Sequence, residues 1–575
     1  MSTAAYKQPD HIAEIVVREP LDKARASWIE RMRSADHKVI GTTLIGFSLI
    51  AVVLAGVTEL LGWAQLFVPD NTFLTPERFY ALHTLSDTSF LYLFALPLFA
   101  GLATYVLPLQ IGARATAFPR LSALGVWMIV LGGAFLFFSL FFNQWLGGAN
   151  MSVPLASSFY SPGPGADFWI VAAMMVAGGL ACNAVDLAVT YSTLRADGMT
   201  GRQTPVFAYT TAVYAYGVLA TAPVLIAAGL MLLFERQWAV FGIFDPVNGG
   251  NALLWKTLFQ WWAHSAPYLV TLMAIGVVSE IVPVAARTKL ANREVVKRAS
   301  MFFAVFGILS FGQVFFSSPV ANGWNCTFML FGLALLAPAA VIVTSWIRTL
   351  RAGSLLVSAH ALFALSFIGF FVLGMIANTA LSLPTLGRWL SGSEFGYAAW
   401  HDFVWASAAT AGFGGLLYWF PKITGRQVDP FKARVAFSMI SLGTLIAILS
   451  MASLGLDGFP REISEYGAGM GQARNIEAGL ATLLASFGVL GLLINLIQSS
   501  ARGAHAGNDP WHGGTLEWFA PSPPPANNFD TIPTVSSEDP LNDIRARIAA
   551  RSGALAGSVA QPPTAGRPSP QTSGQ

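Results

Sequence analysis

Long apolar stretches recur along most of this chain and constrain its fold more than any other feature. Hydrophobic residues make up 54% of the 575 residues, and charged residues only 11%. About twelve stretches are long enough to cross a bilayer as α-helices, which takes roughly 20 residues. Backbone polar groups in hydrocarbon must be paired within their own segment, so each stretch is predicted to be helical. The sequence therefore predicts an all-α polytopic membrane protein.

Polar segments at both ends divide the chain into three predicted parts. Residues 1–38 form a charged segment, residues 39–500 the twelve-helix membrane domain, and residues 501–575 a tail rich in Pro, Ser and Ala. Composition predicts that this tail is largely disordered after about residue 535. Lys and Arg residues gather in alternate loops, on the side of the basic N-terminal segment. The positive-inside rule therefore predicts that both termini are cytoplasmic.

Charge and cysteine content exclude several other classes of protein. The net charge of +3 is close to neutral for a chain of this length and gives no indication of nucleic-acid binding. The two cysteines, Cys182 and Cys326, lie far apart in apolar stretches and form no thiolate metal motif and no disulfide framework.

One apolar stretch, Phe395 to Arg426, carries ionisable side chains within it. His401 and Asp402 lie inside this stretch, which ends in the sequence Tyr418-Trp-Phe-Pro-Lys422. Ionisable groups are costly in hydrocarbon, so their presence there indicates a functional role. A buried imidazole in such a position needs a metal ion or a hydrogen-bond partner.

This stretch resembles the tenth helix of subunit I of the heme-copper oxidases, the large subunit of cytochrome c and quinol oxidases, which ends in the same five residues. Further matches to that family follow in the correct order along most of the chain: Asp36-His-Lys38, Pro108 to Ala113, Arg195 to Thr200, Gly455 to Tyr466 and Gly507 to Phe529. The resemblance implies a twelve-helix subunit I-like bundle in a bacterial inner membrane.

The resemblance also implies an oxygen-reducing site, a high-spin heme facing a copper ion, but several of its ligands are replaced here. His264 and Tyr268 match the first copper histidine and the tyrosine one helical turn later. The paired copper histidines correspond to Phe316 and Ser317, and the high-spin heme ligand corresponds to Ala399. One imidazole cannot hold copper, so His264 and Tyr268 are interpreted as a relic of the copper site and no copper is expected.

Residues that would deliver protons are replaced as well. The family's aspartate, asparagine, glutamate and lysine positions correspond to Ala115, Ser122, Ala266 and Ile342. Each replacement removes a group that binds a proton or orders water within the membrane. Proton pumping is therefore not expected.

The low-spin heme of the family is predicted to survive. The resemblance assigns His401 as one axial ligand, and the second helix offers only His83, although an ungapped match would fall on Ser86. Three residues are nearly one helical turn, so His83 lies on roughly the same face. Arg461 matches an arginine that meets heme propionates. We predict one low-spin heme, of b type because Trp63 stands near the arginine position that faces a formyl group in heme a.

These features predict a degenerate subunit I that passes single electrons within a respiratory membrane complex and does not itself reduce oxygen. Such a subunit needs other subunits of the complex as partners, with a periplasmic donor such as a cytochrome c, or quinol. Two alternatives are an active terminal oxidase with atypical ligands and a heme-free scaffold or transporter on the same fold. In a transporter, Asp87, Asp186 and Glu280 would line a path through the membrane.

Overall fold

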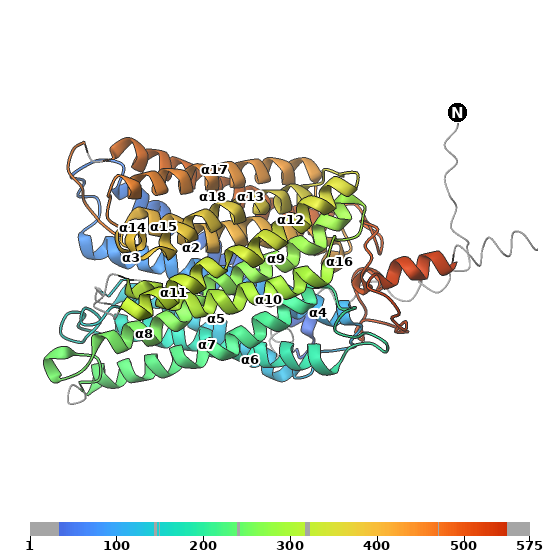
Figure 1. Ribbon diagram of the computed structural model, residues 1–575, viewed down its shortest axis with the longest axis horizontal. Coiled ribbons are helices and arrows are strands. Elements are labelled where there is room, and N and C mark those ends of the chain that lie inside the picture. The colour runs from blue at the N-terminus through green and yellow to red at the C-terminus, as the bar shows by residue number, and fades with distance from the viewer. Residues whose placement is uncertain are drawn as a thin grey trace, which may run out of the picture.

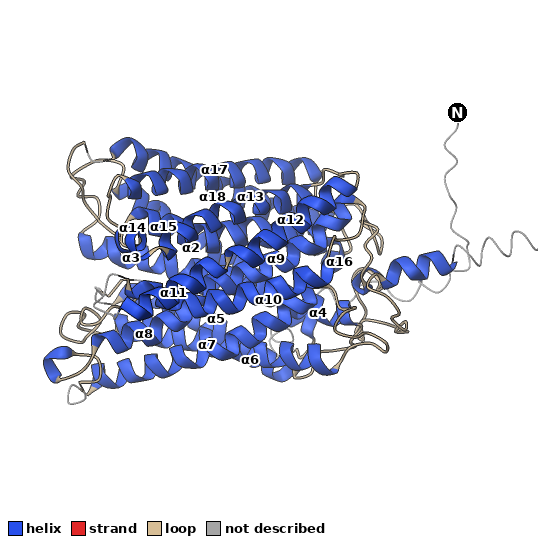
Figure 2. Cartoon of the chain, in the orientation of Figure 1, coloured by secondary structure: helices blue, strands red, loops and turns tan. Residues whose placement is uncertain are grey.

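The computed structural model describes residues 34–142, 147–148, 150–238, 242–316, 322–469 and 471–548. These residues form a single bundle of roughly parallel and antiparallel helices (Figures 1 and 2). The predictions for the first 33 residues, for the end of the tail and for Ser317 concern positions outside these ranges.

Twelve helical spans among the described residues are long and apolar enough to cross a membrane, which confirms the predicted fold class. In chain order they are α2 (His37–Gln65), α3 to α4 (Pro76–Ile111), α5 to η3 (Pro119–Phe141), α6 (Gly165–Thr193), α7 (Val206–Gln237), α8 to α9 (Ala252–Ala286), α10 to η5 (Arg293–Phe315), α11 to α12 (Gly323–Ala352), α13 (Ala359–Ser382), α15 to α16 (Glu394–Thr424), α17 (Pro430–Leu456) and α18 (Gln472–Arg502).

Three of these spans form the interior of the bundle. In the most apolar 18 residues of each span, 100% of the residues are buried in Pro76–Ile111, 89% in Ala252–Ala286 and 94% in Glu394–Thr424. The other nine spans are 28% to 56% buried, as expected for helices with a face toward lipid. The interior spans carry His83, His264 and His401, so all three predicted histidines lie inside the bundle.

Two of the interior spans contain π-helical turns next to the predicted ligands. In the second span, η2 (Ser89–Ala95) follows α3 (Pro76–Thr88), and in the tenth span η6 (Asp402–Ala406) follows α15 (Glu394–His401) directly. A π-helical turn adds a residue to the helical repeat and changes the direction of the side chains that follow, and such turns are frequent at functional sites. These irregularities therefore mark the region around His401.

Close contacts between backbones hold several pairs of neighbouring helices together. A Cβ atom built on Gly125 of α5 would lie 2.5 Å from the carbonyl oxygen of Gly179 of α6, and one built on Gly179 would lie 2.5 Å from the oxygen of Gly125. Gly41 of α2 and Gly101 of α4 approach each other in the same way, at 2.8 and 2.9 Å. Small residues at such crossings let helices pack without intervening side chains.

The tail covers the end of the bundle at which α4 (Leu96–Ile111) and α16 (Phe413–Thr424) end (Figure 1). The ammonium group of Lys422 donates hydrogen bonds to the carbonyl oxygens of Ala520 at 2.7 Å and Asn508 at 3.0 Å. The described tail continues to residue 548. Long-range contacts hold this segment, including an ion pair of 3.2 Å between Arg293 and Asp539, and composition alone cannot predict such contacts.

Glu517 connects the tail to the membrane helices and is completely buried. Its Oε1 atom accepts a hydrogen bond from Gln110 at 3.1 Å, whereas its Oε2 atom has no hydrogen-bond partner. Burial, and to a smaller extent the nearby carboxylate of Glu280, raises the pKa of Glu517 to about 7. The tail is therefore docked through a carboxyl group that the folded state favours in its neutral form.

This burial predicts that stability depends on pH. The ordinary pKa of glutamate is 4.5, so between pH 4.5 and 7 the folded state binds more protons than the unfolded state. The free energy of unfolding should then fall by roughly 3 kcal/mol as the pH rises through this range. Thermal unfolding of the solubilised protein at pH 5 and pH 8 measures the change. Glu517→Gln should remove much of this dependence, whereas the same replacement at the exposed Glu465 should retain it.

Candidate functional site

A cavity of about 680 Å³ lies between the second, sixth and tenth spans, and His264, Tyr268 and Ala399 line it. The Nε2 atom of His264 lies 3.0 Å from the hydroxyl oxygen of Ser310. Tyr268 donates a hydrogen bond of 2.8 Å to the side-chain oxygen of Asn378. The structure thus brings the predicted His-Tyr pair together, with 5.2 Å between the ring centroids, and gives each member a protein partner.

The described residues at the other predicted ligand positions, Ala399 and Phe316, contribute no metal donors to this cavity. Ala399 presents only a methyl group, and Phe316 is buried with an apolar ring. Among the described residues that line the cavity, His264 is the sole histidine. One imidazole, already hydrogen-bonded, is a poor donor set for copper, which requires several nitrogen or sulfur ligands.

His401 lies in a different environment, at the end of α15. It lines a largely apolar cavity of about 100 Å³ together with Phe90, Trp405 and residues of α2, α17 and α18, among them Glu59. The side chain is buried, and its Nε2 atom has no hydrogen-bond partner. A buried imidazole nitrogen without a partner is unusual in a protein interior and is the donor that heme iron takes from histidine. The residues around His401 therefore fit a heme ligand.

His83 faces charged groups in place of an apolar cavity. It lies in α3, where its Nε2 atom is 3.8 Å from a carboxylate oxygen of Asp87, and its ring stacks on Phe79. The ring of Tyr397 contacts His83, with 5.0 Å between centroids, and also contacts His401, with 4.4 Å between centroids. A porphyrin between the two histidines would have to displace Tyr397. Ligation of one heme by both histidines stays a prediction from the sequence.

Arg461 also has a partner within the chain. Its guanidinium donates to the Oδ2 atom of Asp87 at 3.2 Å, and it pairs with Glu462 at the same distance. Burial lowers the pKa of Arg461, but the carboxylates of Glu462 and Asp87 outweigh this effect, and the net shift is upward. The group that the sequence assigned to a heme propionate is thus neutralised by two carboxylates of the protein.

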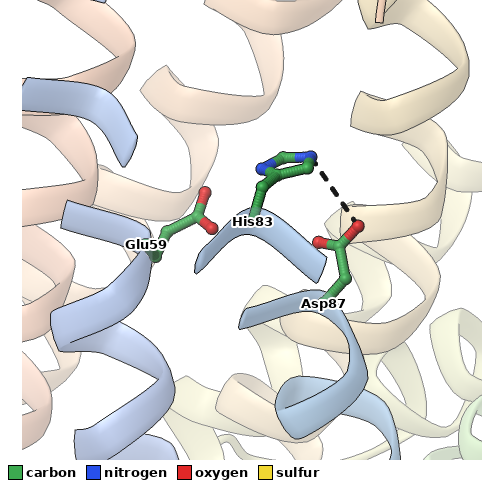
Figure 3. Close-up of side chains that lie close together, drawn as sticks. All are labelled: Glu59, His83 and Asp87. Carbon is green, nitrogen blue, oxygen red and sulfur yellow. Dashed lines mark ion pairs between the residues drawn. The ribbon is translucent and has the colours of Figure 1, made fainter. Parts of the chain in front are cut away.

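Figure 3 shows the cluster in which His83 takes part. Glu59 of α2 and Asp87 lie on either side of the imidazole, and one candidate ligand atom from each of the three residues lies within 4.8 Å of the others. The sequence analysis missed Glu59, although a single carboxylate within the first apolar stretch was a detectable signal. The structure therefore places three ionisable side chains from two neighbouring spans in one buried cluster.

The two other carboxylates proposed for a transport path are engaged locally. Asp186 accepts hydrogen bonds of 2.6 Å from the backbone N–H of Phe118 and from the hydroxyl of Ser122. Glu280 accepts one of 3.1 Å from the backbone N–H of Phe207. Both side chains serve to join neighbouring helices, and neither lines the cavities beside His401 and His264.

Twelve membrane spans, with His83, His264 and His401 on the three interior spans, form the arrangement expected of the heme-copper oxidase class. The model of the cytochrome c and quinol oxidase polypeptide I family matches residues 39–489. The chain therefore belongs to this family, and the resemblance found in the sequence is confirmed.

Curated relatives cover nearly the whole chain. A putative cytochrome c oxidase subunit 1-beta of Streptomyces coelicolor is 33% identical over 91% of this chain and 91% of its own length. A cytochrome c oxidase subunit 1 of Corynebacterium efficiens is 32% identical over 95% of this chain and 94% of its own length. The structure of a heme-copper terminal oxidase dimer matches with a TM-score of 0.68 at 15% identity, covering 91% of this chain and 99% of the other, and supports the fold.

Proposed function

We propose that this chain is a subunit I that has lost oxygen reduction and passes single electrons within a membrane respiratory complex. The proposal rests on the difference between the cavity beside His264 and the cavity beside His401. The cavity that would hold the high-spin heme and copper contains one histidine, which is hydrogen-bonded to Ser310, whereas His401 keeps an unpartnered nitrogen beside an apolar cavity. The donor for one heme is present, and the donors for the oxygen-reducing pair are absent from the described lining residues.

A low-spin heme of b type, bound at His401, would supply reversible one-electron chemistry. His401 would hold the iron through Nε2. The walls of α2, α17 and α18, which are largely apolar apart from Glu59, would limit the access of water and so influence the potential. Of the two predicted ligands, His401 has the stronger geometric support, because His83 faces carboxylates.

The remaining parts of the proposal concern the surroundings of the chain. We place it in a bacterial inner membrane with both termini cytoplasmic, which the basic residues in alternate loops support. Other subunits of the complex are its partners, and a periplasmic cytochrome c, or quinol, is its electron donor. The names of the curated relatives, which are cytochrome c oxidase subunits, support this choice of partners.

Spectroscopy of the purified protein tests the proposal. We expect a reduced-minus-oxidised difference spectrum of one b-type heme per chain and no copper on metal analysis. Copper together with a carbon monoxide-reactive heme would show an active terminal oxidase. Complete absence of heme would favour a scaffold or a transporter.

A further inference from the structure

The cluster around His83 has the composition and geometry of a metal site. We propose that Glu59, His83 and Asp87 bind a divalent transition-metal ion of the Zn²⁺, Mn²⁺ or Fe²⁺ class. Their candidate ligand atoms lie within 4.8 Å of one another, and the imidazole lies between the two carboxylates (Figure 3). Imidazole nitrogen suits transition metals, and two carboxylates suit harder dications, so the mixed donor set selects ions that accept both.

Hydrogen bonds from neighbouring side chains hold both carboxylates in position. Glu59 accepts bonds of 2.9 Å from the indole N–H of Trp63 and from the hydroxyl of Ser86. Asp87 accepts a bond of 2.8 Å from the hydroxyl of Tyr397. Each carboxylate oxygen has a second lone pair that these bonds leave available for a metal ion. Outer hydrogen bonds of this kind orient metal ligands and tune their basicity.

The cluster also contains donors that lack partners and a space of the right size. A cavity of about 20 Å³, enough for a single ion or water molecule, is lined by Glu59, His83 and Glu394, whereas Asp87 is not among its lining residues. Glu394 is only 7% exposed, and its Oε2 atom has no hydrogen-bond partner. The Nε2 atom of His83 is shielded from solvent and also has none. Two donor atoms without hydrogen-bond partners beside one cavity favour a bound cation at this position.

The charges around the cluster also favour a bound metal ion. Four carboxylates gather here, those of Glu59, Asp87, Glu394 and Glu462, and among their described neighbours Arg461 supplies one permanent positive charge. Buried carboxylates without compensating charge are strongly unfavourable, above all within a membrane. A divalent cation would offset most of the excess negative charge. Glu59 also lines the cavity beside His401, and a metal ion on His83 would exclude His83 as an axial ligand of a heme held by His401.

Metal binding to the purified full-length protein tests the site, with Mn²⁺ as the probe after treatment with a chelator. We expect one Mn²⁺ per chain, and a loss of affinity of about tenfold or more in Glu59→Gln and His83→Gln. His264→Gln, which changes a half-buried imidazole outside the cluster, should bind Mn²⁺ as the wild type does. Equal affinity in all four proteins, or no binding to the wild type, would overturn the proposal.

A second measurement on the wild type guards against variants that fail to fold. Pulsed electron paramagnetic resonance of bound Mn²⁺ should detect coupling to a ¹⁴N nucleus of the His83 imidazole, and absence of this coupling would contradict the site. Heme content is measured on the same samples. The proposal predicts that His83→Gln keeps its heme, whereas heme loss with unchanged Mn²⁺ binding would show that His83 is a heme ligand. A wild type that binds Mn²⁺ but no heme would refute the proposed function alone.

Discussion

Replacing His401 with alanine is expected to lower the heme content of the purified protein by about tenfold or more, because it removes the axial nitrogen that the proposed function requires. The side chain is buried and hydrogen-bonded to nothing through Nε2, so the replacement leaves no other polar group without a partner. Heme extraction and the reduced-minus-oxidised spectrum, normalised to protein, measure the loss.

Two controls make the result specific to His401. His264→Ala and His360→Ala also remove imidazoles, one half-buried and one buried, but their Nε2 atoms lie 3.0 Å from Ser310 and 2.9 Å from Ser358, so both variants should keep their heme. Imidazole added during purification should restore part of the spectrum in His401→Gly. Full heme content in His401→Ala would mean that the iron is bound elsewhere in the chain.

Leucine at Gly125 is expected to destabilise the folded protein by more than about 3 kcal/mol, the upper end of the usual cost of overpacking. Its Cβ atom would lie 2.5 Å from the carbonyl oxygen of Gly179, an atom of the backbone that cannot rotate away. The two helices α5 and α6 would have to separate along their contact. Thermal unfolding and the yield of folded protein after solubilisation measure this effect.

The matched control is Gly46→Leu in α2. Gly46 is exposed, and no atom lies within 4 Å of a Cβ atom built on it. Leucine there should change the stability by less than about 0.5 kcal/mol, as surface substitutions usually do. Similar stability of the two variants would contradict the close approach of α5 and α6.

The predicted helices were confirmed because they follow from properties local to each segment. The thickness of hydrocarbon sets the length of a span, and the need to pair every backbone group makes it helical. The docking of residues 536–548 could not be predicted in this way. It depends on Arg293, which lies more than two hundred residues earlier in the chain.

For the candidate site too, the sequence predicts some features and not others. Residue identity alone predicts which donors remain, since Ala399 and Phe316 can bind no metal wherever the fold places them. The surroundings of the remaining donors could not be predicted. Helical periodicity gives the face on which His83 lies, but the axial position of α3 against α2 and α15 decides whether this face meets a heme or a carboxylate.

The sequence by itself determined twelve membrane spans and membership of the oxidase family, and it predicts the loss of most oxygen-site ligands. Only the tertiary structure decided that Glu59 lies beside His83, that Asp87 pairs with Arg461, and that Tyr397 contacts both predicted heme ligands. The physical reason is that side chains from spans far apart in sequence meet only when helices pack, and packing fixes their rotation and register.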